Sequence, residues 1–138
     1  MVFIPLDVSR FHLIAKPGTL TSSSGLVLFV AGWGIMTLAV RENAFAAPVV
    51  KHQEEREQRV IDSRVYNVVR HPMDAGGVPL LVGMPLWLES YAAAMLASVP
   101  IGTLVLWILV EEQFLKRDLK GYDAYTERVR YRLIPFLW

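Results

Sequence analysis

The sequence predicts an all-helical integral membrane protein with about three transmembrane helices, one span followed by a helical hairpin, and a cytoplasmic C-terminal amphipathic helix. Three observations favour this class. Of the 138 residues, 54% are hydrophobic and 20% are charged, which is more apolar than an ordinary soluble domain. Two long segments carry no charge, and the basic residues gather outside them. A chain of this length forms one domain, and we expect that domain to lie in a membrane.

The first 19 residues do not resemble a secretory signal sequence, because charged residues and Pro17 interrupt them. A signal sequence needs a continuous apolar core of about 7–15 residues. We therefore expect a loop or an interfacial segment that leads into the first span.

The two uncharged segments are residues 20–40 and residues 91–110. A helix needs about 20 apolar residues to cross the hydrocarbon core of a bilayer, so each segment is long enough to span it. Between them, residues 76–88 supply a shorter apolar helix that must tilt or thin the bilayer. The second and third helices then form a hairpin, with Glu89 at its turn.

The segment between the first two spans is polar. Residues 41–60 begin as a loop that is broken at Pro48 and continue as a polar helix. Residues 62–69 are expected to be extended or irregular.

The second span is expected to begin at Pro72, because proline suits the first position of a helix. Gly76, Gly77 and Gly83 follow on this helix. Small residues allow close approach between membrane helices, so we expect another helix to pack against them.

The residues after the third span repeat with helical spacing. Apolar side chains recur every three or four positions from Leu115 to Leu133, which is typical of one face of an amphipathic helix. Gly121 weakens this helix near its middle. We expect one helix that lies at the membrane interface or folds back over the cytoplasmic loop.

The basic residues indicate the orientation in the membrane. Most of the 14 Lys and Arg residues lie in residues 41–70 and 116–132. Basic loops favour the cytoplasmic side, so both segments face the cytoplasm and the N-terminus lies outside. Acidic residues are mixed among the basic ones, which is typical of folded polar elements and not of tails that bind nucleic acid.

Three groups of residues that can carry chemistry fall on this cytoplasmic face. They are the run Tyr66 to Pro72 with Gly76 close behind, the pair Glu111-Glu112, and the C-terminal set Tyr122, Tyr125, Arg128 and Arg132. Because the hairpin between the first two groups returns to the face it left, we expect all three groups to meet.

The pair Glu111-Glu112 follows directly on the last uncharged segment. Carboxylates at the end of an apolar helix are costly unless they meet water or cations. The structural interpretation pairs Glu112 with Lys116, one helical turn later, while Glu111 reaches the headgroups. The functional interpretation places both acids in a binding site.

The sequence also excludes several kinds of chemistry. The absence of cysteine excludes a disulfide scaffold, a thiolate metal site and a cysteine nucleophile. The three histidines are His12, His52 and His71, and they form neither an HExxH motif nor a close pair, so we expect no metal site. A net charge of +1 gives no reason to expect a nucleic acid as partner.

Residues 41–76 and 111–135 resemble the isoprenylcysteine carboxyl methyltransferase family, within a wider group that includes the phospholipid methyltransferases. The family pattern is Tyr-x-x-x-Arg-His-Pro-x-Tyr-x-Gly, a membrane hairpin, Glu-Glu-x-x-Leu, Tyr-x-x-Tyr and a closing Arg-x-x-Pro. The matching residues are Tyr66, Arg70, His71, Pro72, Gly76, Glu111, Glu112, Leu115, Tyr122, Tyr125, Arg132 and Pro135. Two features depart from the family: Asp74 stands where a tyrosine is usual, and one span precedes the motif where members have more.

The resemblance implies methyl transfer that depends on S-adenosylmethionine. It implies a single membrane domain over residues 1–138, in which 1–40 form the N-terminal segment and first span and 41–138 form a methyltransferase-like core. The acceptor would enter from the bilayer as a prenylcysteine-type or other lipophilic carboxylate. Two alternatives stay open: a phospholipid or other small hydrophobic acceptor, and a non-catalytic, N-terminally shortened paralogue.

The resemblance and the charges together suggest roles for the site residues. The residues expected to bind the cofactor are Tyr66, His71, Pro72, Gly76, Glu111, Glu112, Tyr122 and Tyr125. The residues expected to act on the reacting groups are Arg70, Arg128 and Arg132. Asp74 adds a negative charge beside the motif and works against a bound carboxylate.

Overall fold

The computed structural model describes residues 3–11, 13–14, 17–43 and 60–138. Its elements are α1 (Phe3–Leu6), the π-helical turn η1 (Asp7–Phe11), α2 (Thr19–Glu42), the 3₁₀ turn η2 (Arg64–Asn67), α3 (Pro72–Trp87), α4 (Tyr91–Leu96), α5 (Ser98–Asp118) and α6 (Tyr122–Arg128). No strand occurs among the described residues. The prediction of an all-helical protein is confirmed for this part of the chain.

Two rods of helix are long and apolar enough to cross a membrane. They are α2, with 24 residues, and the consecutive helices α4 and α5, with 28. Val27, Leu106 and Trp107 on these rods are each more than 60% exposed, as expected of side chains that face lipid rather than a water-soluble core. The helix α3 has 16 residues and is about 24 Å long, so it is shorter than either rod.

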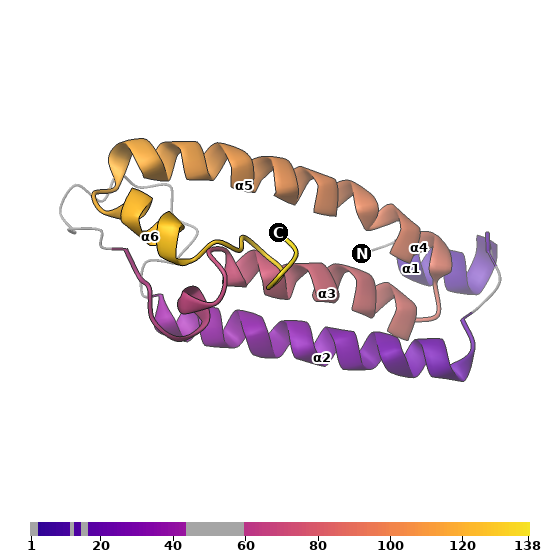
Figure 1. Cartoon of the computed structure of the whole chain (residues 1–138). Helices are drawn as coiled ribbons and strands as arrows, with labels where there is room; N and C mark the ends of the chain where they lie inside the picture. The colour runs from indigo at the N-terminus through magenta and orange to yellow at the C-terminus, as the bar shows by residue number, and fades with distance from the viewer. Residues whose placement is uncertain (1–2, 12, 15–16, 44–59) are drawn as a thin grey trace.

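The helices α2 and α3 lie side by side and antiparallel (Figure 1). Glycines line their contact: a Cβ atom added to Gly32 would lie 2.6 Å from the carbonyl oxygen of Gly76, and one added to Gly83 would lie 2.6 Å from that of Gly25. The predicted close approach is therefore confirmed for Gly76 and Gly83. It is wrong for Gly77, whose added Cβ would meet only Leu104 of α5, at 3.9 Å.

The start of α3 agrees with the sequence prediction, because Pro72 is its first residue. Before it, the chain forms the short turn η2 within the segment predicted to be irregular. The polar helix predicted within residues 41–60 falls mostly on residues 44–59, which lie outside the described residues.

The single C-terminal amphipathic helix predicted from Leu115 to Leu133 is wrong. The helix α5 ends at Asp118, and α6 begins only at Tyr122. Gly121 between them has a φ of 85°, a left-handed conformation that breaks a right-handed helix and that glycine adopts without steric cost. The helix α6 can therefore fold back beside the end of α5 (Figure 1).

The apolar periodicity nevertheless identified the residues that α6 buries. Tyr122, Tyr125 and Val129 form a buried cluster. Leu115 and Leu119 from the end of α5, together with Val60, pack against this cluster.

The N-terminal segment was predicted as a loop or an interfacial segment. It contains the short helices α1 and η1, so the loop is wrong and the interfacial placement stays a prediction. A buried carboxylate holds it in place: Asp7 Oδ2 accepts a hydrogen bond from Ser90 Oγ at 2.5 Å, and Asp7 Oδ1 accepts one from the Leu13 amide at 3.1 Å. Ser90 lies in the turn between α3 and α4. The segment therefore caps the end of the bundle opposite α6 (Figure 1).

Candidate active site

The three predicted groups of residues meet at the end of the bundle that carries α6 (Figure 1). The residues just before α3 are bound to the segment after α6, since the amide of Arg70 donates to the carbonyl of Tyr131 and that of His71 to the carbonyl of Arg132, both at 2.9 Å. This pairing brings residues 61 positions apart in the chain into one site. It also restricts the backbone at both segments, so their side chains keep a fixed position relative to one another.

Glu112 of α5 is the centre of the site. Its Oε1 accepts a hydrogen bond from Arg70 Nε at 2.7 Å and lies 3.3 Å from His71 Nε2, while its Oε2 accepts from Arg132 Nε at 3.0 Å. Only 4% of Glu112 is exposed. The predicted partner Lys116 is wrong, because Glu112 turns inward to these three residues and Lys116 is exposed.

Arg70 is committed to structural contacts. Besides its bond to Glu112, its Nη1 donates to the carbonyl oxygens of Val129 and Arg130, at 2.9 and 3.0 Å. Its side chain is 6% exposed. A buried charge pair with this many hydrogen bonds is costly to break, so Arg70 and Glu112 together join α3, α5 and the C-terminal segment.

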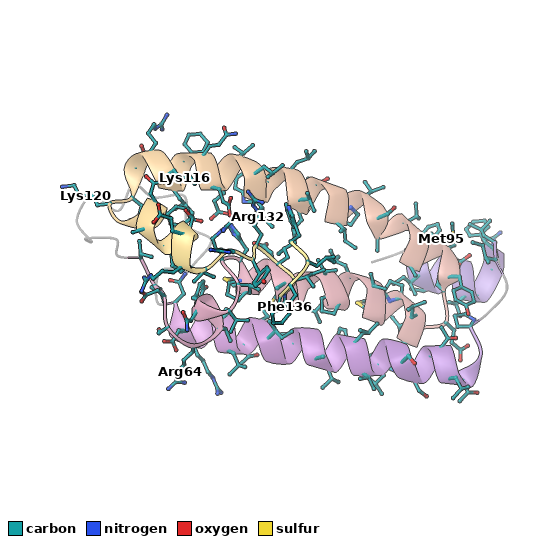
Figure 2. All side chains as sticks on the ribbon, viewed as in Figure 1. Arg64, Met95, Lys116, Lys120, Arg132 and Phe136 are labelled. Carbon is teal, nitrogen blue, oxygen red and sulfur yellow. The ribbon has the colours of Figure 1, made fainter. Side chains whose placement is uncertain are left out.

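The guanidinium of Arg132 has N–H groups that bind no described residue. This side chain reaches from the C-terminal segment toward α5 (Figure 2) and is 30% exposed. One nitrogen binds Glu112, and the guanidinium lies 5.2 Å from the centre of the Trp138 ring. Its remaining N–H groups can meet an anionic ligand.

The open side of the site is acidic. Nδ1 of His71 faces Asp74 Oδ2 at 3.7 Å and Glu111 Oε2 at 3.9 Å. These two carboxylate side chains are 29% and 39% exposed, whereas that of His71 is 6% exposed. From the sequence, Asp74 was a departure from the family pattern and a charge that works against a bound carboxylate, and it was not among the predicted site residues. Its spacing of three residues from His71 at a helix start is the signal that places it here.

The aromatic residues surround the site from α6 and η2. Tyr125 Oη donates to the carbonyl of Tyr66 at 2.6 Å, and the rings of Tyr122 and Tyr125 lie 5.6 Å apart. Tyr122 Oη is buried with no hydrogen-bond partner among the described residues. Burial raises the pKa of Tyr66, Tyr122 and Tyr125 above the usual phenol value. These phenols therefore stay protonated at neutral pH and can donate hydrogen bonds.

Three of the predicted site residues are placed differently. Arg128 points away to Asp62, with 2.5 Å between Nη2 and Oδ2. Pro72 is fully buried as the first residue of α3. Gly76 lies against Gly32 of α2, where it serves helix packing.

A cavity of about 300 Å³ adjoins the site. Residues 67–68, 128–131 and 135–136 line it. These residues include Val129 and Arg130, whose carbonyl oxygens accept the hydrogen bonds of Arg70. The exposed Arg128 therefore borders this cavity and not the cluster around Glu112.

Comparison with known proteins adds one finding. The profile of a family described as phospholipid methyltransferase matches residues 20–120. The match runs from α2 to the end of α5 and includes Arg70, His71 and both glutamates. No curated protein matches the chain significantly.

Proposed function

Because the chain belongs to the phospholipid methyltransferase family, we propose that it is a membrane methyltransferase that uses S-adenosylmethionine to methylate the amine headgroup of a phospholipid. The family match carries the assignment to methyl transfer. It favours the phospholipid alternative over the prenylcysteine carboxylate that the sequence analysis put first.

The charges at the open side of the site support an amine as the acceptor. Asp74 and Glu111 are the half-exposed charges nearest His71, and Arg70 is buried and paired with Glu112. A carboxylate acceptor would meet two negative charges here, whereas an ammonium group would be attracted to them.

The residues present fit the cofactor. S-adenosylmethionine supplies a methyl group activated by its attachment to a sulfonium. Its polar parts need hydrogen-bond partners. The phenol of Tyr122, which has no partner in the described part of the chain, can meet one of its hydroxyl or amine groups. The side-chain N–H groups of Arg132 that bind no described residue suit the carboxylate of its methionine part. Cofactor roles for five other residues remain predictions: Tyr66, Pro72, Gly76, Glu112 and Tyr125. Reacting-group roles for Arg70 and Arg128 also remain predictions.

We propose three membrane helices, α2, α3 and the α4–α5 rod, with the site and the C-terminal segment on the cytoplasmic side and the N-terminus outside. Exposed basic residues support this orientation: Arg64, Lys116 and Lys120 lie at the end of the bundle that holds the site, and Met95 lies at the opposite end (Figure 2). Basic residues favour the cytoplasmic side of a membrane.

Titration of the purified protein with S-adenosylhomocysteine in detergent tests the cofactor site by calorimetry. We expect the wild type to bind and Tyr122→Phe to bind about tenfold more weakly, because a hydrogen bond in a buried site contributes about 1 kcal/mol or more. Tyr91→Phe is the matched control, since Tyr91 lies at the far end of the bundle beside Thr21, and we expect its affinity to be unchanged. A wild type that does not bind the ligand would contradict the proposed function.

A further inference from the structure

One ring nitrogen of His71 lies against Glu112, and the other faces the carboxylates of Asp74 and Glu111. Its Nε2 lies 3.3 Å from Glu112 Oε1, a carboxylate already bound by two arginines. A carboxylate only accepts hydrogen bonds, so Nε2 carries a proton and donates it. In the neutral ring Nδ1 then holds a lone pair, and no described residue lies within hydrogen-bond distance of it.

That lone pair points at two negative charges. One carboxylate oxygen of Asp74, one of Glu111 and a ring nitrogen of His71 lie within 4.8 Å of one another, and Nδ1 is the nitrogen that faces both acids. Three electron-rich atoms at this separation repel one another unless a positive group or a proton lies between them. The other charged groups that face the ring are Glu112 and, through it, Arg70 and Arg132, and these three already neutralise one another in part.

We propose that His71, Asp74 and Glu111 bind the protonated amine of the acceptor and that Nδ1 of His71 takes its proton before methyl transfer. This inference rests on the proposed function and names the catalytic base of that site. A lipid amine is an ammonium ion at neutral pH and has no lone pair to attack a methyl group. Some group must therefore remove a proton.

The proton step balances within these residues. One N–H bond of the ammonium breaks, its electron pair stays on the amine nitrogen, and the proton forms a bond with Nδ1 of His71. The freed pair is the nucleophile that methyl transfer requires. The imidazolium is stabilised by Asp74 and Glu111 on one side and by Glu112 on the other, and its proton leaves to water past the half-exposed Glu111.

The first experiment measures binding rather than turnover. Calorimetry in detergent compares a short-chain phosphatidylethanolamine with the matching phosphatidylcholine, whose quaternary headgroup has no proton to give. We expect the wild type to bind the ethanolamine lipid more tightly than the choline lipid. In the double variant Asp74→Asn with Glu111→Gln, we expect the ratio of the two affinities to fall about tenfold. Asp123→Asn, an exposed acid of α6, is the control, and we expect no change.

The second experiment measures the rate of methylation of the ethanolamine lipid at neutral pH. We expect the double variant to methylate this lipid about tenfold more slowly than the wild type, because the lost carboxylates no longer attract the ammonium group. We expect His71→Gln to reduce the rate about a hundredfold or more.

The outcomes separate this proposal from the proposed function. If the wild type binds S-adenosylhomocysteine and methylates lipid but the double variant matches Asp123→Asn in both experiments, the base assignment is wrong and the function stands. If the double variant weakens S-adenosylhomocysteine binding alone, the acids hold the cofactor's own amine and the proposal fails. A preference for ethanolamine lipid that appears only with added divalent cations would also overturn it.

Discussion

Glu112 shows how one residue organises the site. Its buried carboxylate is the only described group that contacts Arg70, His71 and Arg132 together. Arg70 lies on the chain 42 residues before it. From the sequence we considered only Lys116, one helical turn away, as a partner. The pairing rule for helices covers only residues three or four positions apart on the same helix. The motif predicted which residues meet, and the structure was needed to show which of them are bonded.

Replacing this carboxylate should destabilise the protein. Glu112→Gln leaves the buried guanidinium of Arg70 without a counter-charge, and we expect a loss of about 3 kcal/mol in the free energy of unfolding. Thermal unfolding in detergent measures this loss as a lower melting temperature. Glu127→Gln, an exposed acid on α6, is the control. Equal melting temperatures for the two variants would show that the cluster does not hold the site together.

Asp74 stands where the family pattern described above has a tyrosine. Sequence reasoning treated its charge only as an obstacle to a bound carboxylate. In the structure it faces His71 together with Glu111, which makes the same charge an attraction for an ammonium group. Whether the charge of Asp74 weakens or strengthens acceptor binding depends on whether the acceptor carries a carboxylate or an ammonium group. The sequence alone left both kinds of acceptor open.

At the scale of elements, the contact between α2 and α3 fixes the position of α3, whose first residue directly follows Arg70 and His71 of the site. Both helices place glycines seven residues apart, Gly25 and Gly32 on α2 and Gly76 and Gly83 on α3. The positions of the glycines in the sequence predicted that another helix packs closely against α3. They could not predict the partners of these glycines on α2 or the exception at Gly77, because those depend on how the two helices are rotated against each other.

A methyl group at this contact should push the helices apart. We expect Gly32→Ala to lower the free energy of unfolding by about 2 kcal/mol, as overpacking does, since the new Cβ would lie 2.6 Å from a carbonyl oxygen of α3. Gly34→Ala on the same helix is a matched control, because no atom lies within 4 Å of its added Cβ. If the two variants unfold at the same temperature in detergent, the backbone contact between α2 and α3 is not present in solution.

The break between α5 and α6 marks the limit of periodicity as a predictor. The spacing of Tyr122, Tyr125 and Val129 predicted correctly that they share a buried face. It could not show that Gly121 adopts a left-handed conformation, because a helix that folds back and one that continues can bury the same side chains. The turn matters for function, since it directs the chain toward the C-terminal segment that carries Arg132.

At the scale of the whole molecule, the protein has two ends with different roles. One end gathers Arg70, His71, Glu111, Glu112 and Arg132. The other is fastened by the buried hydrogen bond between Asp7 and Ser90. The charge-free segments and the basic clusters predicted that the polar site residues gather at one end. The short N-terminal helices were not predicted, because they depend on a contact between residues 83 positions apart that no local pattern shows.

The absence of cysteine makes the orientation measurable, because a single cysteine can be introduced and labelled alone. In sealed vesicles of known orientation, we expect Lys120→Cys to react with a membrane-impermeant maleimide only from the cytoplasmic side. Glu89→Cys, in the exposed turn at the other end, should react only from the outside. Labelling of both positions from the same side would contradict the proposed topology.

The central claim is that this small bundle transfers a methyl group to a lipid amine. Its most direct test reconstitutes the protein in liposomes that contain phosphatidylethanolamine, adds S-adenosylmethionine with an isotopically labelled methyl group, and identifies the labelled lipid by mass spectrometry. We expect the label on the headgroup nitrogen, in an amount that falls sharply in the Asp74→Asn and Glu111→Gln double variant. Label on a carboxylate, or no labelled lipid from a protein that binds S-adenosylhomocysteine, would contradict the claim.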